Sequence, residues 1–128
     1  MSTYTTMNLT DVADSVGERA PGIEGRFLRT HLGSRDLGVS QFRYGPGVRS
    51  PIAHSHKVQE EAYVVTAGSG RMLLDNEVID LRLADVVRVA PEVVRAFEGG
   101  ADGLELICIG GPRPEEGDGV MGAAEWPA

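Results

Sequence analysis

The sequence predicts an all-β chain that folds as a single barrel or sandwich. Its 128 residues include 17 glycines and 7 prolines but only 5% aromatic residues, a composition of many tight turns rather than long helices. Short apolar runs alternate with turn residues at intervals of roughly ten residues, which is the spacing of strands in sandwiches and barrels. A chain of this length fits one domain, so we expect no second one.

The first 22 residues are polar and only weakly periodic, and we interpret residues 1–22 as a short N-terminal arm. Within it, Asn8 or Thr10 can cap a short helix over residues 11–16, and Pro21 with Gly22 would end that helix. The arm is expected to contribute little to the core.

Residues 23–110 carry the strand signals and form the predicted barrel domain. Turn residues separate the strands. In Gly45-Pro46-Gly47 the proline fixes its own φ and glycine permits a positive φ, and Asp75-Asn76 suits a two-residue hairpin loop. The predicted strands are 26–31, 37–44, 52–56, 61–66, 71–74, 78–81, 86–89, 95–98 and 104–109.

Residues 111–128 are interpreted as a C-terminal tail without a strand. The composition after Gly110-Gly111 is acidic and rich in glycine and proline. Trp126 is the only tryptophan, and we expect it to dock the tail onto the barrel, since a single tryptophan near a terminus more often packs than recognises a partner.

Charge and hydropathy exclude several classes of function. The net charge of −7 and the absence of a basic run argue against nucleic acid as a partner. The N-terminus lacks the basic and apolar segments of a secretory signal, and no run approaches the ~18 apolar residues of a membrane span. Cys108 stands alone in an apolar strand, where a buried, reduced thiol is expected. We therefore expect a cytoplasmic protein with no membrane partner.

One short segment carries the residues of a metal site. His54 and His56 lie two apart in a predicted strand, so both imidazoles point to the same face. A carboxylate from the next strand would complete a set of two histidines and one acid, and Glu61 begins that strand whereas Glu60 lies in the bend. The alternative is a pair of hydrogen-bonded histidines at a strand end, with no metal.

The spacing of this segment resembles a known motif. Gly47, His54-Ser55-His56, Glu61 and Gly68 resemble the first motif of the cupin family, G-x(5)-H-x-H-x(3,4)-E-x(6)-G, with six residues instead of five between Gly47 and His54. The six residues before Gly68 select Glu61 rather than Glu60. The resemblance implies a cupin-type jelly-roll barrel, or double-stranded β-helix, flanked by the short N-terminal arm and the C-terminal tail.

The second cupin motif, G-x(5)-P-x-G-x(2)-H-x(3)-N, is altered. Residues 84–97 resemble its frame, but Ala84 replaces the first glycine and Arg95 stands where a histidine usually supplies a fourth ligand. A guanidinium stays protonated and cannot ligate a metal. Arg95 can instead pair with Glu61, bind a carboxylate of a substrate, or lie partly exposed at the rim of the barrel.

The resemblance implies a divalent metal ion (iron, manganese, zinc or nickel) held by His54, His56 and Glu61. Tyr63 and Arg95 are the candidate substrate-binding residues, and Phe97 is expected in the core. We expect a small metal-binding cupin that acts on a small anionic or oxygen-rich molecule in the barrel pocket, with oxygenase- or isomerase-type chemistry. The alternative is a non-catalytic small-molecule-binding barrel with weak or no metal. By resemblance, the chain is expected to form a homodimer.

Overall fold

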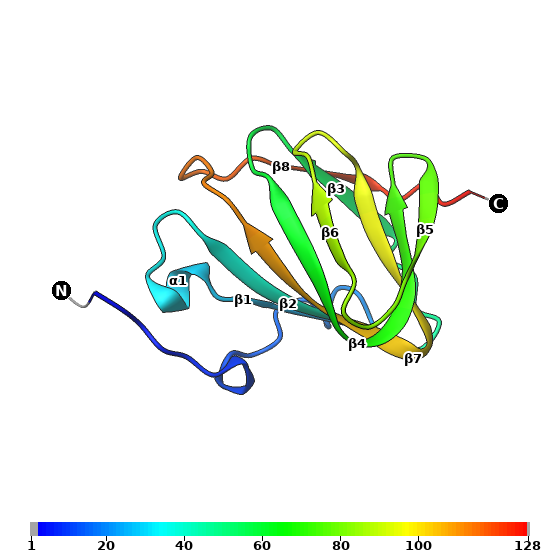
Figure 1. Cartoon of the computed structure of the whole chain (residues 1–128), viewed down its shortest axis with the longest axis horizontal. Helices are drawn as coiled ribbons and strands as arrows, with labels where there is room; N and C mark the ends of the chain where they lie inside the picture. The colour runs from blue at the N-terminus through cyan, green and yellow to red at the C-terminus, as the bar shows by residue number, and fades with distance from the viewer. Residues whose placement is uncertain (1–2, 128) are drawn as a thin grey trace.

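The structure, a computed structural model, describes residues 3–127 and confirms the all-β prediction. Its strands pair antiparallel throughout and curl around one interior (Figure 1). The sheet runs in the order β1-β2-β7-β3-β8, and β4 pairs with β5, β6 and β7. The strands are β1 (Ile23–Phe27), β2 (Gly38–Tyr44), β3 (Ile52–His56), β4 (Glu61–Leu74), β5 (Glu77–Leu81), β6 (Val86–Val89), β7 (Arg95–Gly110) and β8 (Gly119–Ala123).

Two long strands, β4 and β7, run the length of the barrel and pair with each other (Figure 1). Each replaces two predicted strands, so the predicted turns at 68–70 and 99–103 were wrong. Register shifts near Val65 and Gly68 let β4 bend without ending. Gly68 has φ +71, and a Cβ there would lie 2.1 Å from the Gly103 carbonyl oxygen, so only glycine fits this close approach.

The shorter strands β2, β3, β5 and β6 lie where the sequence predicts them, and Asp75 takes the positive φ of 56° expected in the hairpin loop between β4 and β5. The prediction for 26–31 was wrong at both ends, because β1 already begins at Ile23. The chain leaves β1 after Phe27 and forms the single helical turn α1 (Arg29–Leu32). Gly33 closes this turn in the left-handed conformation, and its N–H bonds back to Arg29 and Thr30.

The N-terminal arm holds a 3₁₀ turn, η1 (Leu9–Asp11), instead of a helix over 11–16. Asn8 caps this turn as predicted, since its side chain accepts from the Thr10 N–H at 2.9 Å. The Asp14 carboxylate accepts from the N–H groups of Val16 and Gly17 within the arm and from the Gly25 N–H of β1. The arm is thereby tied to the edge of β1.

The tail contains a strand that the sequence did not predict. Strand β8 pairs antiparallel with all five residues of β3, the strand that carries both histidines. Three of the five residues of β8 are glycine or alanine and all five are exposed, so backbone pairing rather than buried apolar side chains holds it in place. Trp126 docks as predicted: its Nε1–H donates to the Ser50 carbonyl at 3.1 Å, and the Arg49 guanidinium lies 4.7 Å from the ring centre.

The core fills part of the barrel interior and leaves a cavity beside it. Phe97 packs in the core as predicted, between Tyr44 and Tyr63 with ring centres 5.7 and 4.9 Å away. A cavity of about 740 Å³ adjoins this cluster, and β1, β2, β3, β4, β7 and β8 all contribute to its wall. Among residues 3–127, none of the helices has the length and apolar character needed to cross a membrane.

Candidate metal centre

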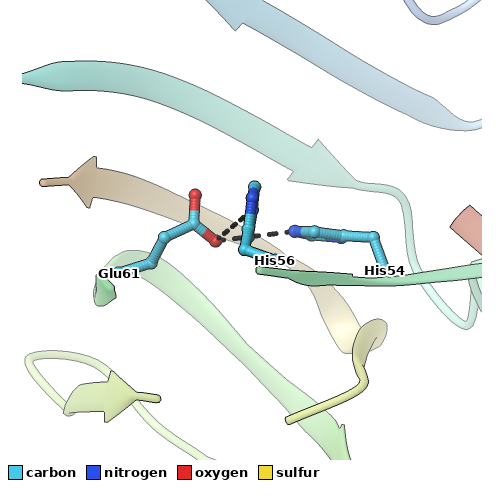
Figure 2. A group of neighbouring side chains, drawn as sticks. All are labelled: His54, His56 and Glu61. Carbon is cyan, nitrogen blue, oxygen red and sulfur yellow. Dashed lines mark ion pairs between the residues drawn. The ribbon is translucent and has the colours of Figure 1, made fainter. Parts of the chain in front are cut away.

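His54 and His56 of β3 and Glu61, the first residue of β4, meet at the wall of this cavity (Figure 2). Both imidazoles point to the same carboxylate oxygen, with Nε2 to Oε1 distances of 3.5 Å from His54 and 3.4 Å from His56. The rings stand nearly perpendicular, and one donor atom from each residue lies within 4.8 Å of the others. This is the two-histidine, one-carboxylate set that the sequence spacing predicts.

The two nitrogens of His56 have different surroundings. Nδ1 lies 2.9 Å from Oδ1 of Asp118, whereas Nε2 is buried and has no hydrogen-bond partner among residues 3–127. The neighbouring Glu61 carboxylate raises the pKa of His56 against the opposing effect of burial, and Asp118 adds to the increase. A proton and a metal ion therefore compete for Nε2.

Glu61 is buried and receives donors on both oxygens. The Tyr63 hydroxyl donates to Oε1 at 2.5 Å, and the Cys108 thiol donates to Oε2 at 3.3 Å. Burial raises the pKa of Glu61, but the two histidines and the Tyr63 hydroxyl outweigh it and hold the pKa well below its ordinary value. Glu61 is therefore an ionised carboxylate, while Glu60 is exposed and pairs with Arg88.

Arg95 is completely buried beside these groups, so the interpretation of a partly exposed rim residue was wrong. Its Nη1 donates to the carbonyls of Pro91 and Val93, and its Nε donates to the Tyr63 hydroxyl at 3.3 Å. Nη2 lies 3.3 Å from Glu61 Oε1, a charge contact that lacks hydrogen-bond geometry. The guanidinium thus pairs with Glu61, and most of its donors are used within the chain.

Asp118 is a site residue that the sequence analysis missed. It comes from the tail, 62 positions after His56, and its side chain is only 2% exposed. Besides facing His56, it accepts from the N–H groups of Val58 and Gln59 at 2.6 and 2.8 Å. Burial raises the pKa of Asp118, but these N–H groups and His56 lower it to about 2. No local spacing signals this contact, which depends on the pairing of β8 with β3.

Cys108 is the second residue whose contact was missed, although its burial was predicted. Its side chain lies on the inner face of β7 with Leu104 and Leu106. Strand alternation places these three residues together, and that alternation was the available signal. Burial raises the pKa of Cys108, so the group beside Glu61 is a thiol and not a thiolate.

Comparison with known proteins finds no matching family model. One curated relative is an uncharacterized protein, MJ1618, of Methanocaldococcus jannaschii, which is 31% identical over 62 residues. The match covers 48% of this chain and 50% of that protein, so the chain spans about half the length of the curated relative it matches.

Solved structures resemble the chain over most of its length. A cupin protein (BF4112) from Bacteroides fragilis has a TM-score of 0.73 and 27% identity over 90% of this chain and 89% of its own. A sugar phosphate isomerase from a cupin superfamily, from Silicibacter pomeroyi, has a TM-score of 0.70 and 16% identity over 97% of this chain and 96% of its own. The polyketide cyclase RemF from Streptomyces resistomycificus has a TM-score of 0.71 and 18% identity over 84% of this chain and 78% of its own. The last two share the fold at low identity.

Proposed function

Since the chain belongs to the cupin superfamily, we propose that its barrel holds a divalent metal ion at His54, His56 and Glu61 and acts as an enzyme on a small molecule in the adjoining cavity. The observation that carries this proposal is the buried Nε2 of His56, which lacks a partner among residues 3–127 and lies at the point where the other two donor atoms converge. A buried nitrogen without a partner is costly, and a metal ion would satisfy it.

The donor set suits iron(II), manganese, zinc or nickel, because imidazole and carboxylate ligands serve all of these ions. Such an ion, when bound, supplies Lewis-acid or redox chemistry. Relatives of the same fold include a sugar phosphate isomerase and a polyketide cyclase. We propose oxygenase- or isomerase-type chemistry for this chain.

The chain's own residues prepare the ligands. Asp118 faces Nδ1 of His56, which keeps the proton on that nitrogen and leaves the Nε2 lone pair directed at the site. Tyr63 holds one oxygen of Glu61 by a hydrogen bond, and Arg95 balances its charge. These contacts fix the carboxylate before any ligand arrives, which lowers the cost of binding.

Elemental analysis of protein purified without chelator tests the proposal. The parent is expected to hold about one metal ion per chain, and both His54→Ala and His56→Ala are expected to lose it. His31→Ala is the matched control, since the remaining histidine is exposed on α1, away from the site. A parent that holds no metal even after reconstitution with iron, manganese, zinc and nickel would refute the proposal.

A non-catalytic barrel that binds a small molecule without metal is the second candidate function. The observation that favours it is the 3.3 Å contact of Arg95 with Glu61, which neutralises the carboxylate without an ion. If this candidate is right, a chelator will change neither the melting temperature nor ligand binding. A fall in melting temperature on chelation, restored by adding back one ion, would favour the metal enzyme.

A further inference from the structure

The arginines around the cavity differ from those elsewhere on the chain. Seven of the eleven arginines form ion pairs with carboxylates: Arg26, Arg35, Arg43, Arg49, Arg71, Arg88 and Arg95. Within residues 3–127, four arginines have no such partner, namely Arg19, Arg29, Arg82 and Arg113. Three of these, Arg19, Arg29 and Arg113, line the cavity that adjoins the candidate metal centre.

The absence of carboxylate partners for the cavity arginines is unexpected on a chain with a net negative charge. The chain has 19 acidic residues against 12 basic ones, so acidic side chains outnumber the arginines and can pair with them on most of the surface. The only carboxylates among the residues that line the cavity are Glu61 and Asp118, and both are buried and already accept hydrogen bonds. The wall of the cavity therefore carries more positive than negative side chains on an acidic protein, which draws anions to it.

Arg29 and Arg113 lie against the same segment of the tail. Arg29 donates from Nη2 to the Gly111 carbonyl at 3.4 Å and from Nη1 to the Arg35 carbonyl at 3.3 Å, and Arg113 follows two residues after Gly111. The Arg113 guanidinium rests on Gly117, the neighbour of Asp118, since a Cβ on that glycine would lie 2.9 Å from Nη1. Arg113 is exposed and donates no hydrogen bond within residues 3–127, so its donors are open to a ligand.

The remaining wall of the cavity is largely apolar. Phe27 and Phe42 line it and pack edge to face, with ring centres 5.5 Å apart. Ile52 and Met121, on the paired strands β3 and β8, line it as well. Phe27, Ile52 and Met121 are 49%, 48% and 71% exposed, so apolar surface is left uncovered beside the arginines.

We propose that the cavity binds a small organic carboxylate with an apolar body. The carboxylate is held by Arg113 and Arg29, and the apolar body lies against Phe27, Ile52 and Met121. This inference rests on the proposed function insofar as the bound molecule would lie beside the candidate metal centre. It assigns anion recognition to the tail side of the cavity and not to Arg95, because Arg95 is completely buried and its guanidinium already faces the carboxylate of Glu61.

Calorimetric titration with three probes tests the inference: naphthoate, the neutral naphthalenemethanol and inorganic phosphate. Naphthoate is expected to bind at least about tenfold more tightly than either of the others, because only it offers both a carboxylate and an apolar body. Arg113→Gln is expected to weaken naphthoate binding about fivefold or more, and Arg29→Gln/Arg113→Gln further. The matched control is Arg82→Gln, which removes an unpaired arginine outside the cavity and should leave binding unchanged.

The inference is overturned if naphthoate does not bind, if naphthalenemethanol or phosphate binds as tightly, or if Arg113→Gln binds naphthoate like the parent. Metal content, measured on the same samples, separates this result from the proposed function. Metal in the parent with no effect of Arg113→Gln overturns the anion site alone. A parent that stays metal-free even after reconstitution, and whose naphthoate binding depends on Arg113, supports the anion site and refutes the metal enzyme.

Discussion

The substitution Asp118→Asn would reverse the hydrogen-bond direction at one end of the His56 ring while hardly changing side-chain volume. Oδ2 of Asp118 accepts from the N–H groups of Val58 and Gln59, and Oδ1 faces Nδ1 of His56. Asparagine has a single carboxamide oxygen, and the two backbone donors require it. Its NH₂ group must then face His56, so Nδ1 becomes the acceptor and the proton moves to Nε2. A protonated Nε2 cannot bind a metal ion.

The expected loss of metal affinity is about 10- to 100-fold, the usual effect of removing a carboxylate that orients a histidine ligand, or roughly 1.4 to 2.7 kcal/mol. The alanine variant behaves differently. Asp118→Ala leaves the buried N–H of Gln59 without a partner, at about 1 to 3 kcal/mol, and that of the partly buried Val58 at a smaller cost, but it does not force the proton onto Nε2. Asparagine should therefore be worse for metal affinity, and alanine should be worse for stability.

Zinc titration against a competing chelator near neutral pH measures the affinity, and urea unfolding of the metal-free protein measures the free energy of unfolding. Asp80→Asn serves as the control because Asp80 is exposed on β5. An Asp118→Asn variant that binds zinc as tightly as the parent, or more tightly than Asp118→Ala, would show that Asp118 does not set the tautomer of His56.

Three further predictions concern the barrel: urea unfolding checks the first and, as a function of pH, the third, and hydrogen exchange checks the second. Gly68→Ala should lower the free energy of unfolding by more than about 2 kcal/mol, since it adds a clash with the Gly103 carbonyl to a positive φ. Gly47→Ala, at φ +70 with open space around it, should lower it by only about 1 kcal/mol. Equal losses would contradict the close approach of Gly68 to Gly103. Trp126→Ala should release the tail, so β8 amides should lose hydrogen-exchange protection while β2 amides keep theirs. Burial raises the pKa of Glu98, but its two arginine partners lower it below the ordinary value. The stability that Glu98 contributes is therefore present above its unfolded-state pKa and is lost as the pH falls through its folded-state pKa. In Glu98→Gln, the free energy of unfolding should depend less on pH over this acid range.

The parts of the fold that the sequence predicts correctly depend on local signals. Strand alternation and turn residues locate β2, β3, β5 and β6, because each of these strands is short and has turn residues at its ends. The errors in the two long strands that were predicted as four short ones share one cause. Glycines at 68–70 and 99–103 were interpreted as turns, yet they allow β4 and β7 to approach each other closely and bend together as continuous strands. A glycine in the sequence does not distinguish these two uses.

In the candidate site, too, the residues that local spacing signals were predicted and those that long-range pairing brings in were missed. His54, His56 and Glu61 follow from spacing within eight residues of one another, so the sequence places them together. Asp118 reaches His56 only because β8 pairs with β3, and β8, with glycine or alanine at three of its five positions, has no alternating apolar pattern that predicts this pairing. The burial of Arg95 likewise depends on carbonyl acceptors at Pro91 and Val93, which are backbone groups that no side-chain pattern reveals.

Arg95 links the metal site to the anion that we propose as its ligand. A histidine in its place would be neutral when it bound a metal, whereas the guanidinium adds a permanent positive charge 3.3 Å from Glu61. With a divalent ion bound, the ion and Arg95 would carry three positive charges against the two negative charges of Glu61 and Asp118. The surplus would lie in a partly apolar cavity, where charge is screened less than in water. An anionic ligand would neutralise this charge, so Arg95 favours an anion by its field, while Arg29 and Arg113 would make the direct contacts.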